Sequence, residues 1–159
     1  MTPAEIKPRH YPAILRSNAR FVHWLSPLDE GDLSELQNRS DYARQLYEGE
    51  AAMFAYDGGS DYRHKHVEWL SAHLDRYLYI DRIIVGESAQ GRGAGRALYS
   101  DLENFARQAG HIHLACEVNT APNNPGSHTF HLNTGFTPLG DADYADGLSV
   151  RYYVRKLQD

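Results

Sequence analysis

The sequence reads IIVGESAQGRGAGR from residue 83 to residue 96, and this stretch decides how the chain is interpreted. A short apolar run, too short for a typical helix, leads into three glycines at alternate positions, Gly91, Gly93 and Gly95. Glycine lets the backbone adopt positive φ angles and approach a ligand closely. The pattern therefore predicts a strand, a ligand-binding turn and a helix in direct succession.

The predicted helix would complete an anion site. Apolar residues recur at helical spacing between 96 and 109, at Leu98, Leu102, Phe105 and Ala109. The first amides of a helix lack intrahelical partners and lie at the positive end of its dipole, so they favour phosphate. Arg92 and Arg96 would add charge-assisted contacts to the same anion.

Three phosphate-binding patterns compete for this turn. A P-loop requires Gly-x-x-x-x-Gly-Lys-Ser/Thr, which the sequence lacks. The dinucleotide pattern Gly-x-Gly-x-x-Gly would begin at Gly91 but meets Arg96 where helix–strand packing requires a third glycine. The pattern Gln/Arg-x-x-Gly-x-Gly/Ala, which holds the pyrophosphate of coenzyme A, fits residues 90–95 at every fixed position. A flexible turn without a ligand would need only one or two glycines.

A second motif reads NPGSHTFHLNTGF from residue 124 to residue 136. Together the two motifs resemble the GNAT superfamily of N-acetyltransferases. Members often carry Asn-x-x-Ala/Ser, an aromatic residue seven positions after the Asn, and Gly-Phe at positions eleven and twelve. Asn124, Ser127, Gly135 and Phe136 match this pattern, whereas His131 stands where Tyr is usual.

The resemblance implies one GNAT domain over residues 1–159, with acetyl-coenzyme A as co-substrate and no metal. Its fold would be α+β, an α/β-type three-layer arrangement in which helices flank a mixed, splayed β-sheet. The residues that it assigns to cofactor binding are Ile83, Ile84, Val85, Gln90, Gly91, Arg92, Gly93, Ala94, Gly95, Arg96, Asn124, Ser127 and His131.

The local patterns independently predict an order of short elements. The predicted strands are 44–47, 51–56, 77–85, 111–118, 136–139 and 148–157. The predicted helices are 67–74, 96–109, 127–134 and one entered at Asp29. This order indicates an α+β or α/β sheet with helices packed on its faces.

The implied chemistry transfers an acetyl group directly to an amine, which attacks only when neutral. An alkyl amine is almost fully protonated at pH 7, so a carboxylate must accept its proton. Glu117 and Asp81 are the two candidates for this base. Glu117 could instead be an ordinary ion-pair partner, and Asp81 could pair with Arg82 or Arg76. His131 is the candidate acid for the leaving thiolate, or a residue that only packs on the pantetheine arm.

The composition excludes several classes. The net charge is −5 without a basic run, which disfavours nucleic acid as the main partner. The sequence contains no run of about 18 apolar residues, so no membrane-spanning helix is expected. The single Cys116 precludes an internal disulfide and, with no signal peptide, indicates a cytoplasmic protein.

The acceptor is expected to be a small-molecule or peptide amine bound by residues 57–66 and 141–147. Two histidine pairs, His64/His66 and His111/His113, lack a third metal ligand, so a metal site is disfavoured. A homodimer is possible because dimers are common in the resembled family. A non-catalytic acyl-coenzyme A-binding module is the alternative function.

Overall fold

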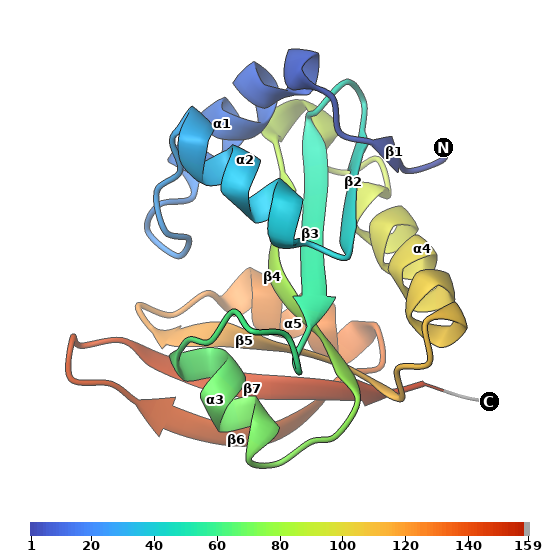
Figure 1. Cartoon of the computed structure of the whole chain (residues 1–159). Coiled ribbons are helices and arrows are strands. Elements are labelled where there is room, and N and C mark those ends of the chain that lie inside the picture. The colour runs from blue at the N-terminus through green and yellow to red at the C-terminus, as the bar shows by residue number, and fades with distance from the viewer. Residues whose placement is uncertain (158–159) are drawn as a thin grey trace. The chain divides into compact units, whose positions relative to one another are not determined.

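The computed structural model describes residues 1–157, whose contacts cluster into two compact units (Figure 1). Unit 1 comprises Met1–Tyr56 and Ile80–Phe105, and unit 2 comprises Asp57–Tyr79 and the chain from Ala106 onward. Strand β4, Tyr77–Val85, begins in unit 2 and ends in unit 1. The single domain over 1–159 stays a prediction.

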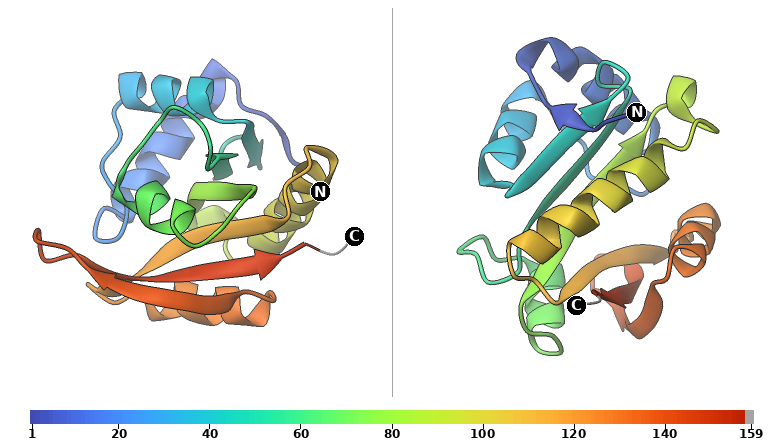
Figure 2. Two further views of the ribbon diagram at one scale, coloured as in Figure 1. Left: turned by 60° about the horizontal axis from the view of Figure 1, so that its bottom comes forward. Right: turned by 90° about the vertical axis from the view of Figure 1, so that its right-hand side faces the viewer.

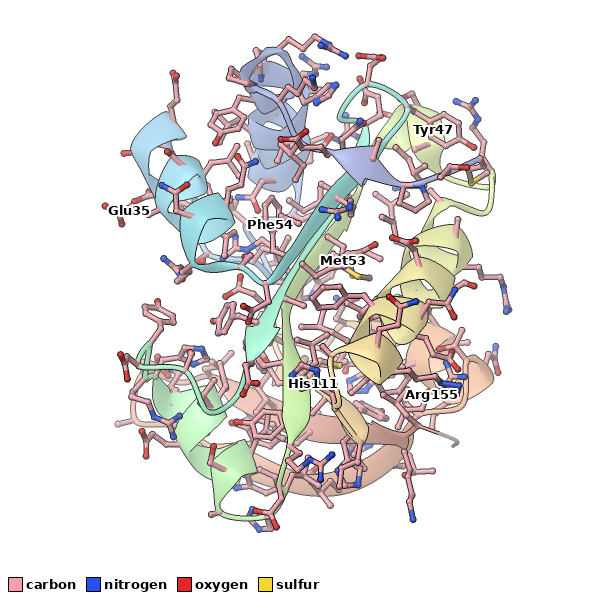
Figure 3. The ribbon with its side chains drawn as sticks, turned by 45° about the vertical axis from the view of Figure 1, so that its right-hand side comes forward. Glu35, Tyr47, Met53, Phe54, His111 and Arg155 are labelled. Carbon is pink, nitrogen blue, oxygen red and sulfur yellow. The ribbon has the colours of Figure 1, made fainter. Side chains whose placement is uncertain are left out.

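Unit 1 contains a sheet with helices on both faces. Its strands are β1 (Ala4–Glu5), β2 (Tyr42–Leu46), β3 (Ala51–Asp57) and the end of β4, hydrogen-bonded in that order. Its helices are α1 (Tyr11–Arg20), α2 (Glu30–Arg39) and most of α4 (Ala94–Gln108). Helices α1 and α2 cover one face of this sheet and α4 covers the other (Figures 1 and 3).

Local sequence explains how unit 1 forms. Asp29 caps α2: its carboxylate accepts from the Asp32 amide at 2.7 Å, and the Asp32 carboxylate accepts from the Asp29 amide at 3.1 Å. On β3 the buried side chains of Met53 and Phe54 point to opposite sides (Figure 3). Both faces of this strand are therefore core.

Unit 2 contains the start of β4 and three further strands (Figure 2). They are β5 (His113–Ala121), β6 (Thr137–Asp143) and β7 (Ser149–Lys156), in the order β4-β5-β7-β6. The ladder between β4 and β5 is parallel and joins Tyr77–Tyr79 to residues 113–115, whereas the other two ladders are antiparallel.

Two helices cover opposite faces of the unit 2 sheet, α3 (Lys65–Ser71) and α5 (Pro125–Asn133). Trp69 of α3 stacks on Tyr152 at 4.1 Å between ring centroids. On the other face, His128 of α5 lies 2.7 Å from the hydroxyl of Tyr153. The adjacent residues Tyr152 and Tyr153 of β7 therefore contact different helices, α3 and α5, on opposite faces of the sheet.

The predicted fold class is confirmed, since a mixed sheet is flanked by helices, and the strand at 77–85 has the predicted bounds. Most other predicted boundaries differ from the observed ones by about one to four residues. Three of these differences have a visible cause. Helix α4 begins at Ala94, because the Ala97 amide already donates to Gly93 O. It ends at Gln108, which leaves Ala109 outside, and β5 begins at His113 because the His111 amide bonds back to Ala106 O.

One helix of the N-terminal part was not predicted. This is α1, although Pro12 lies in its first turn, where proline is compatible with a helix. The helix predicted at 67–74 lies at Lys65–Ser71, so His66 is helical and His64 is the N-cap. Within residues 1–157 no helix has both the length and the hydrophobicity that crossing a bilayer demands.

Candidate functional site

The glycine-rich turn of unit 1 has the conformation that its glycines predict. After β4, a short 3-10 helix, Glu87–Ala89, leads to Gly91 and Gly93, whose φ angles are 76° and 77°. A Cβ at either position would meet no atom within 4 Å. The glycines are therefore required by backbone conformation, and they leave open space beside the main chain.

The helix that follows offers amides to an anion. The first intrahelical hydrogen bond of α4 runs from the Ala97 amide to Gly93 O at 3.0 Å. The amides of Ala94, Gly95 and Arg96 precede it, at the positive end of the helix dipole. These amides, with the open glycine backbone before them, fit a pyrophosphate group.

The side chains of the turn are partly engaged with the protein. The side-chain amide of Gln90 donates to Val85 O at 3.3 Å, so one backbone carbonyl of the strand predicted to bind the pantetheine arm already has a partner. The Arg92 guanidinium lies 3.7 Å above the ring of Tyr47, a residue of the β2–β3 turn (Figure 3). Arg96 is exposed. The ring of Tyr47 supports Arg92 at the mouth of the turn.

A backbone hydrogen bond joins the start of the turn to Glu50, the residue before β3. The Gly86 amide donates to Glu50 O at 2.7 Å, and a Cβ on Gly86 would lie 2.8 Å from that same oxygen and 2.5 Å from Ser17 Oγ. Only glycine at position 86 allows the two backbones to approach this closely without displacement.

Of the strand residues before Gly86, Ile84 is buried, whereas Ile83 and Val85 are half-buried.

Asp81, the first base candidate, lies in unit 1 in an ion pair. Its carboxylate accepts from Arg82 Nε at 2.8 Å and from the Tyr56 hydroxyl at 2.9 Å, and the two charged side chains are 11% and 9% exposed. Arg82 also donates to Asn18 Oδ1 at 3.1 Å and to Ser26 Oγ at 2.9 Å. These contacts give Asp81 a structural role in holding α1 and the segment after it.

Glu117, the second base candidate, lies on β5 in unit 2 with its side chain 17% exposed. One carboxylate oxygen, Oε1, accepts from the Tyr79 hydroxyl at 2.6 Å. The other, Oε2, lies 3.7 Å from His66 Nε2.

The second ring nitrogen of His66 contacts one of a pair of hydrogen-bonded tyrosines. Its Nδ1 lies 2.9 Å from the hydroxyl of the buried Tyr152, which in turn hydrogen-bonds Tyr144. Burial, and then the hydrogen bond with Tyr144, raise the pKa of Tyr152, so this hydroxyl keeps its proton.

The two segments predicted to bind the acceptor meet in unit 2. Lys65 Nζ lies 2.9 Å from Asp146 Oδ2 and 4.7 Å from the ring centroid of Tyr144. Residues 57–66 and 141–147 are therefore joined next to the hydrogen-bonded contacts of Glu117. Sequence reasoning missed Tyr79, His66 and Tyr152 as neighbours of Glu117, because they come from separate elements.

His131 is buried on the opposite face of the unit 2 sheet from Glu117. Glu117 is the cross-strand partner of Tyr152, whereas the His131 ring stacks against Tyr153. His131 Nδ1 lies 2.7 Å from Ser127 O and 3.3 Å from Ser127 Oγ. Burial lowers the pKa of His131, so the imidazole is neutral at pH 7 and its proton bonds the carbonyl.

These contacts favour a packing role for His131, while its acid role stays a prediction. Asn124 is the N-cap of α5, without a side-chain capping bond, and its amide donates to Asn119 O at 3.1 Å. Asn124, Ser127 and His131 thus lie together on α5 in unit 2. The remaining predicted cofactor residues, 83–85 and 90–96, lie together in unit 1.

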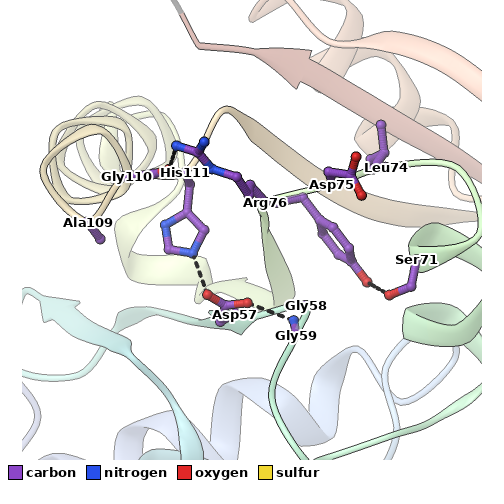
Figure 4. A pocket seen from close by; sticks show the side chains of 11 residues that line it. Asp57, Gly58, Gly59, Ser71, Leu74, Asp75, Arg76, Ala109, Gly110 and His111 are labelled. Carbon is purple, nitrogen blue, oxygen red and sulfur yellow. Dashed lines mark hydrogen bonds and ion pairs between the residues drawn. The ribbon is translucent and has the colours of Figure 1, made fainter.

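A pocket of about 420 Å³ lies elsewhere in unit 2 (Figure 4). It includes the start of the predicted acceptor loop, Asp57 to Gly59, and several of its polar side chains have partners within the pocket lining. His111 Nε2 lies 3.1 Å from Asp57 Oδ2, and Arg76 donates to Gly110 O at 2.8 Å. None of the predicted catalytic residues lines this pocket. Over residues 1–157, no cluster of three or more His, Cys, Asp or Glu side chains could hold a metal ion.

Comparison with known proteins agrees with this geometry. The model of the acetyltransferase (GNAT) family matches residues 18–136. No curated protein sequence gives a match. The ribosomal-protein-S18-alanine N-acetyltransferase from Escherichia coli is similar in structure, with 17% identity, coverage of 99% of this chain and 94% of that one, and a TM-score of 0.69.

Two other solved structures are similar. Ard1 from Thermoplasma volcanium has a TM-score of 0.77 and 15% identity, with coverage of 99% of this chain and 98% of that one. A Bacillus anthracis str. Ames protein solved in complex with acetyl coenzyme A has a TM-score of 0.55 and 15% identity, with coverage of 73% and 61%. At these identities the likeness is one of fold.

Proposed function

The chain belongs to the acetyltransferase (GNAT) family, and from this premise we propose that it transfers the acetyl group of acetyl-coenzyme A directly to an amine. The observation that carries the proposal is the turn of unit 1, where Gly91 and Gly93 adopt left-handed conformations directly before the first amides of α4. Acetyl-coenzyme A would supply the activated thioester. The amides of Ala94, Gly95 and Arg96 would hold its pyrophosphate, as such helix starts hold other anions.

Glu117 is proposed as the base that removes the proton of the acceptor. One of its oxygens accepts from the Tyr79 hydroxyl at 2.6 Å, the other lies 3.7 Å from His66 Nε2, and the carboxylate lies beside the segments proposed to bind the acceptor. Asp81 is the weaker candidate, because protonating it would cost the buried ion pair with Arg82. A positioned base contributes typically 10²- to 10⁴-fold to the rate.

The acceptor is proposed to bind where residues 57–66 and 141–147 meet. The Lys65–Asp146 ion pair and the ring of Tyr144 join these segments beside His66 and Glu117. Small-molecule amines and peptide N-termini both fit an acceptor that only needs to present a neutral nitrogen to Glu117. A homodimer and a cytoplasmic location remain part of the proposal.

Acetyl transfer from acetyl-coenzyme A tests the function, with spermidine, tyramine, lysine methyl ester and tetrapeptides beginning with Ala, Ser or Met as acceptors. We expect turnover with at least one acceptor, a loss of about 10²- to 10⁴-fold in kcat for Glu117→Gln, and unchanged binding of coenzyme A. Asp81→Asn tests the other candidate base, and its kcat per folded molecule should fall much less than that of Glu117→Gln, because the ion pair with Arg82 gives Asp81 a structural role. Binding of coenzyme A without turnover of any amine would favour the acyl-coenzyme A-binding module instead.

A further inference from the structure

Two adjacent tyrosines of β7 bind two different histidines. Tyr152 and Tyr153 are both buried and point to opposite faces of the unit 2 sheet. The Tyr152 hydroxyl lies 2.9 Å from His66 Nδ1, and the Tyr153 hydroxyl lies 2.7 Å from His128 Nδ1. Only His66 also faces a carboxylate proposed for catalysis, Glu117, at 3.7 Å.

We propose that His66 is a positioning residue that fixes the second oxygen of the Glu117 carboxylate for proton abstraction. This inference rests on the proposed function, because it concerns the same base. The Tyr79 hydroxyl donates to Oε1 at 2.6 Å, and His66 Nε2 lies 3.7 Å from Oε2, which is within ion-pair distance but longer than a hydrogen bond. A carboxylate contacted at both oxygens loses less orientational freedom when the acceptor arrives.

The partners of His66 lead to an assignment of its ring proton. Either partner can donate in the 2.9 Å contact between His66 Nδ1 and the Tyr152 hydroxyl, and either hydroxyl can donate between Tyr152 and Tyr144. A carboxylate only accepts, so we assign the ring proton to Nε2, which faces Glu117 Oε2, and leave Nδ1 to accept from the Tyr152 hydroxyl. With this assignment, the Tyr152 hydroxyl stabilises the tautomer that presents Nε2–H to the carboxylate.

The other groups around His66 come from its own segment and from the segment between β6 and β7. The His64 ring centroid lies 5.8 Å from that of His66, and Lys65 is engaged by Asp146. The Tyr144 ring centroid also lies 5.8 Å from the His66 ring. The imidazole therefore has aromatic neighbours from two segments, and the Glu117 carboxylate lies within ion-pair distance of it.

Nuclear magnetic resonance of ¹⁵N-labelled protein tests the tautomer without any acceptor. At a pH where His66 is neutral, we expect its proton on Nε2 in the parent and a change in tautomer population in Tyr152→Phe, which keeps the ring but removes the hydroxyl. Tyr153→Phe is the matched control and should leave the His66 signals unchanged. A parent that carries the proton on Nδ1 would overturn the assignment.

A double-mutant cycle tests the kinetic role with whichever acceptor of the panel is acetylated fastest. We expect His66→Ala to lower kcat about 10- to 100-fold, as loss of an orienting partner does elsewhere, with unchanged KM for acetyl-coenzyme A. In a Glu117→Gln background the same substitution should change kcat by less than about twofold, because the effect passes through Glu117. His66→Gln, which keeps an amide donor near Nε2, should recover part of the rate.

Failure of the His66 inference and failure of the proposed function give different results. An equal loss for His66→Ala with and without Glu117 would show an independent structural role and would overturn the inference while the proposed function stands. A parent that acetylates no amine would overturn the proposed function. The tautomer measurement would still decide which proton His66 carries.

Discussion

The glycine-rich turn gives the sharpest quantitative prediction. Alanine at Gly91 or Gly93 would have to adopt a φ angle of 76° or 77°, in the left-handed region. No atom lies within 4 Å of the added Cβ, so the substitution introduces no collision. The whole cost is therefore conformational, roughly 1–2 kcal/mol for each substitution.

Two measurements show whether this conformational cost weakens binding of coenzyme A or lowers the free energy of unfolding. If the exposed turn relaxes in the free protein, the strain returns when coenzyme A binds, and Kd rises about 5- to 30-fold. If the turn keeps its conformation, the free energy of unfolding falls by the same 1–2 kcal/mol, and the Tm falls by about 2–4 °C per kcal/mol for a chain of this size. Calorimetric titration with coenzyme A and urea unfolding should give two changes that sum to this range.

Gly110→Ala is the matched control, since Gly110 has a φ angle of 86° and an equally open Cβ position outside the turn. It should lower stability by a similar roughly 1–2 kcal/mol and leave the Kd for coenzyme A unchanged. The reasoning is refuted if Gly91→Ala and Gly93→Ala both bind coenzyme A like the parent and unfold like the parent. Equal weakening by Gly110→Ala would refute the assignment of the turn as the binding site.

Four further predictions concern stability and reactivity. Asp81→Asn should lower the free energy of unfolding by roughly 3 kcal/mol in urea titration, because it leaves Arg82, 9% exposed, without its carboxylate; a change below about 1 kcal/mol would contradict the ion pair. Burial lowers the pKa of His131 below its ordinary value of 6.5, so the unfolded chain binds the proton first as pH falls. The parent should therefore lose stability relative to His131→Asn between about pH 7 and pH 5, measured by thermal unfolding, and parallel curves would disprove this. Gly140→Ala places a Cβ 2.8 Å from the Trp69 ring and should cost about 1–3 kcal/mol in thermal unfolding, whereas Gly126→Ala, with open space, should not destabilise. Burial raises the pKa of the Cys116 thiol, so a disulfide reagent such as DTNB should label this single cysteine only after unfolding, and fast labelling of the native protein would count against its burial.

Local patterns were sufficient for the elements that position the cofactor turn. The strand at Tyr77–Val85 and the glycine conformations follow from residue types within a few positions of one another. The start of α4 was misplaced because Gly95 was assigned to the turn, although a helix tolerates glycine in its first turn. Helix α1 was missed because two of its four buried residues, Ser17 and Asn18, are polar, so its buried face does not appear as an apolar stripe.

The surroundings of Glu117 could not be predicted, because they depend on contacts between residues far apart in the chain. His66, Tyr79 and Tyr152 each belong to a different element, and their meeting depends on strand order and register. Sequence patterns report periodicity, not register between distant strands. The sequence favoured Glu117 slightly over Asp81 as the base, and it offered Arg82 as one ion-pair partner of Asp81, which the structure contains.

The β2–β3 turn has a consequence for how this chain can evolve. Tyr47 and Glu48 have φ angles of 56° and 54°, in the left-handed region that tyrosine and glutamate residues rarely adopt. A drift to glycine at position 47 would relieve that strain and make the fold more stable, yet it would remove the ring on which Arg92 rests at 3.7 Å. Selection for ligand retention and selection for thermal robustness should therefore act in opposite directions at this one residue.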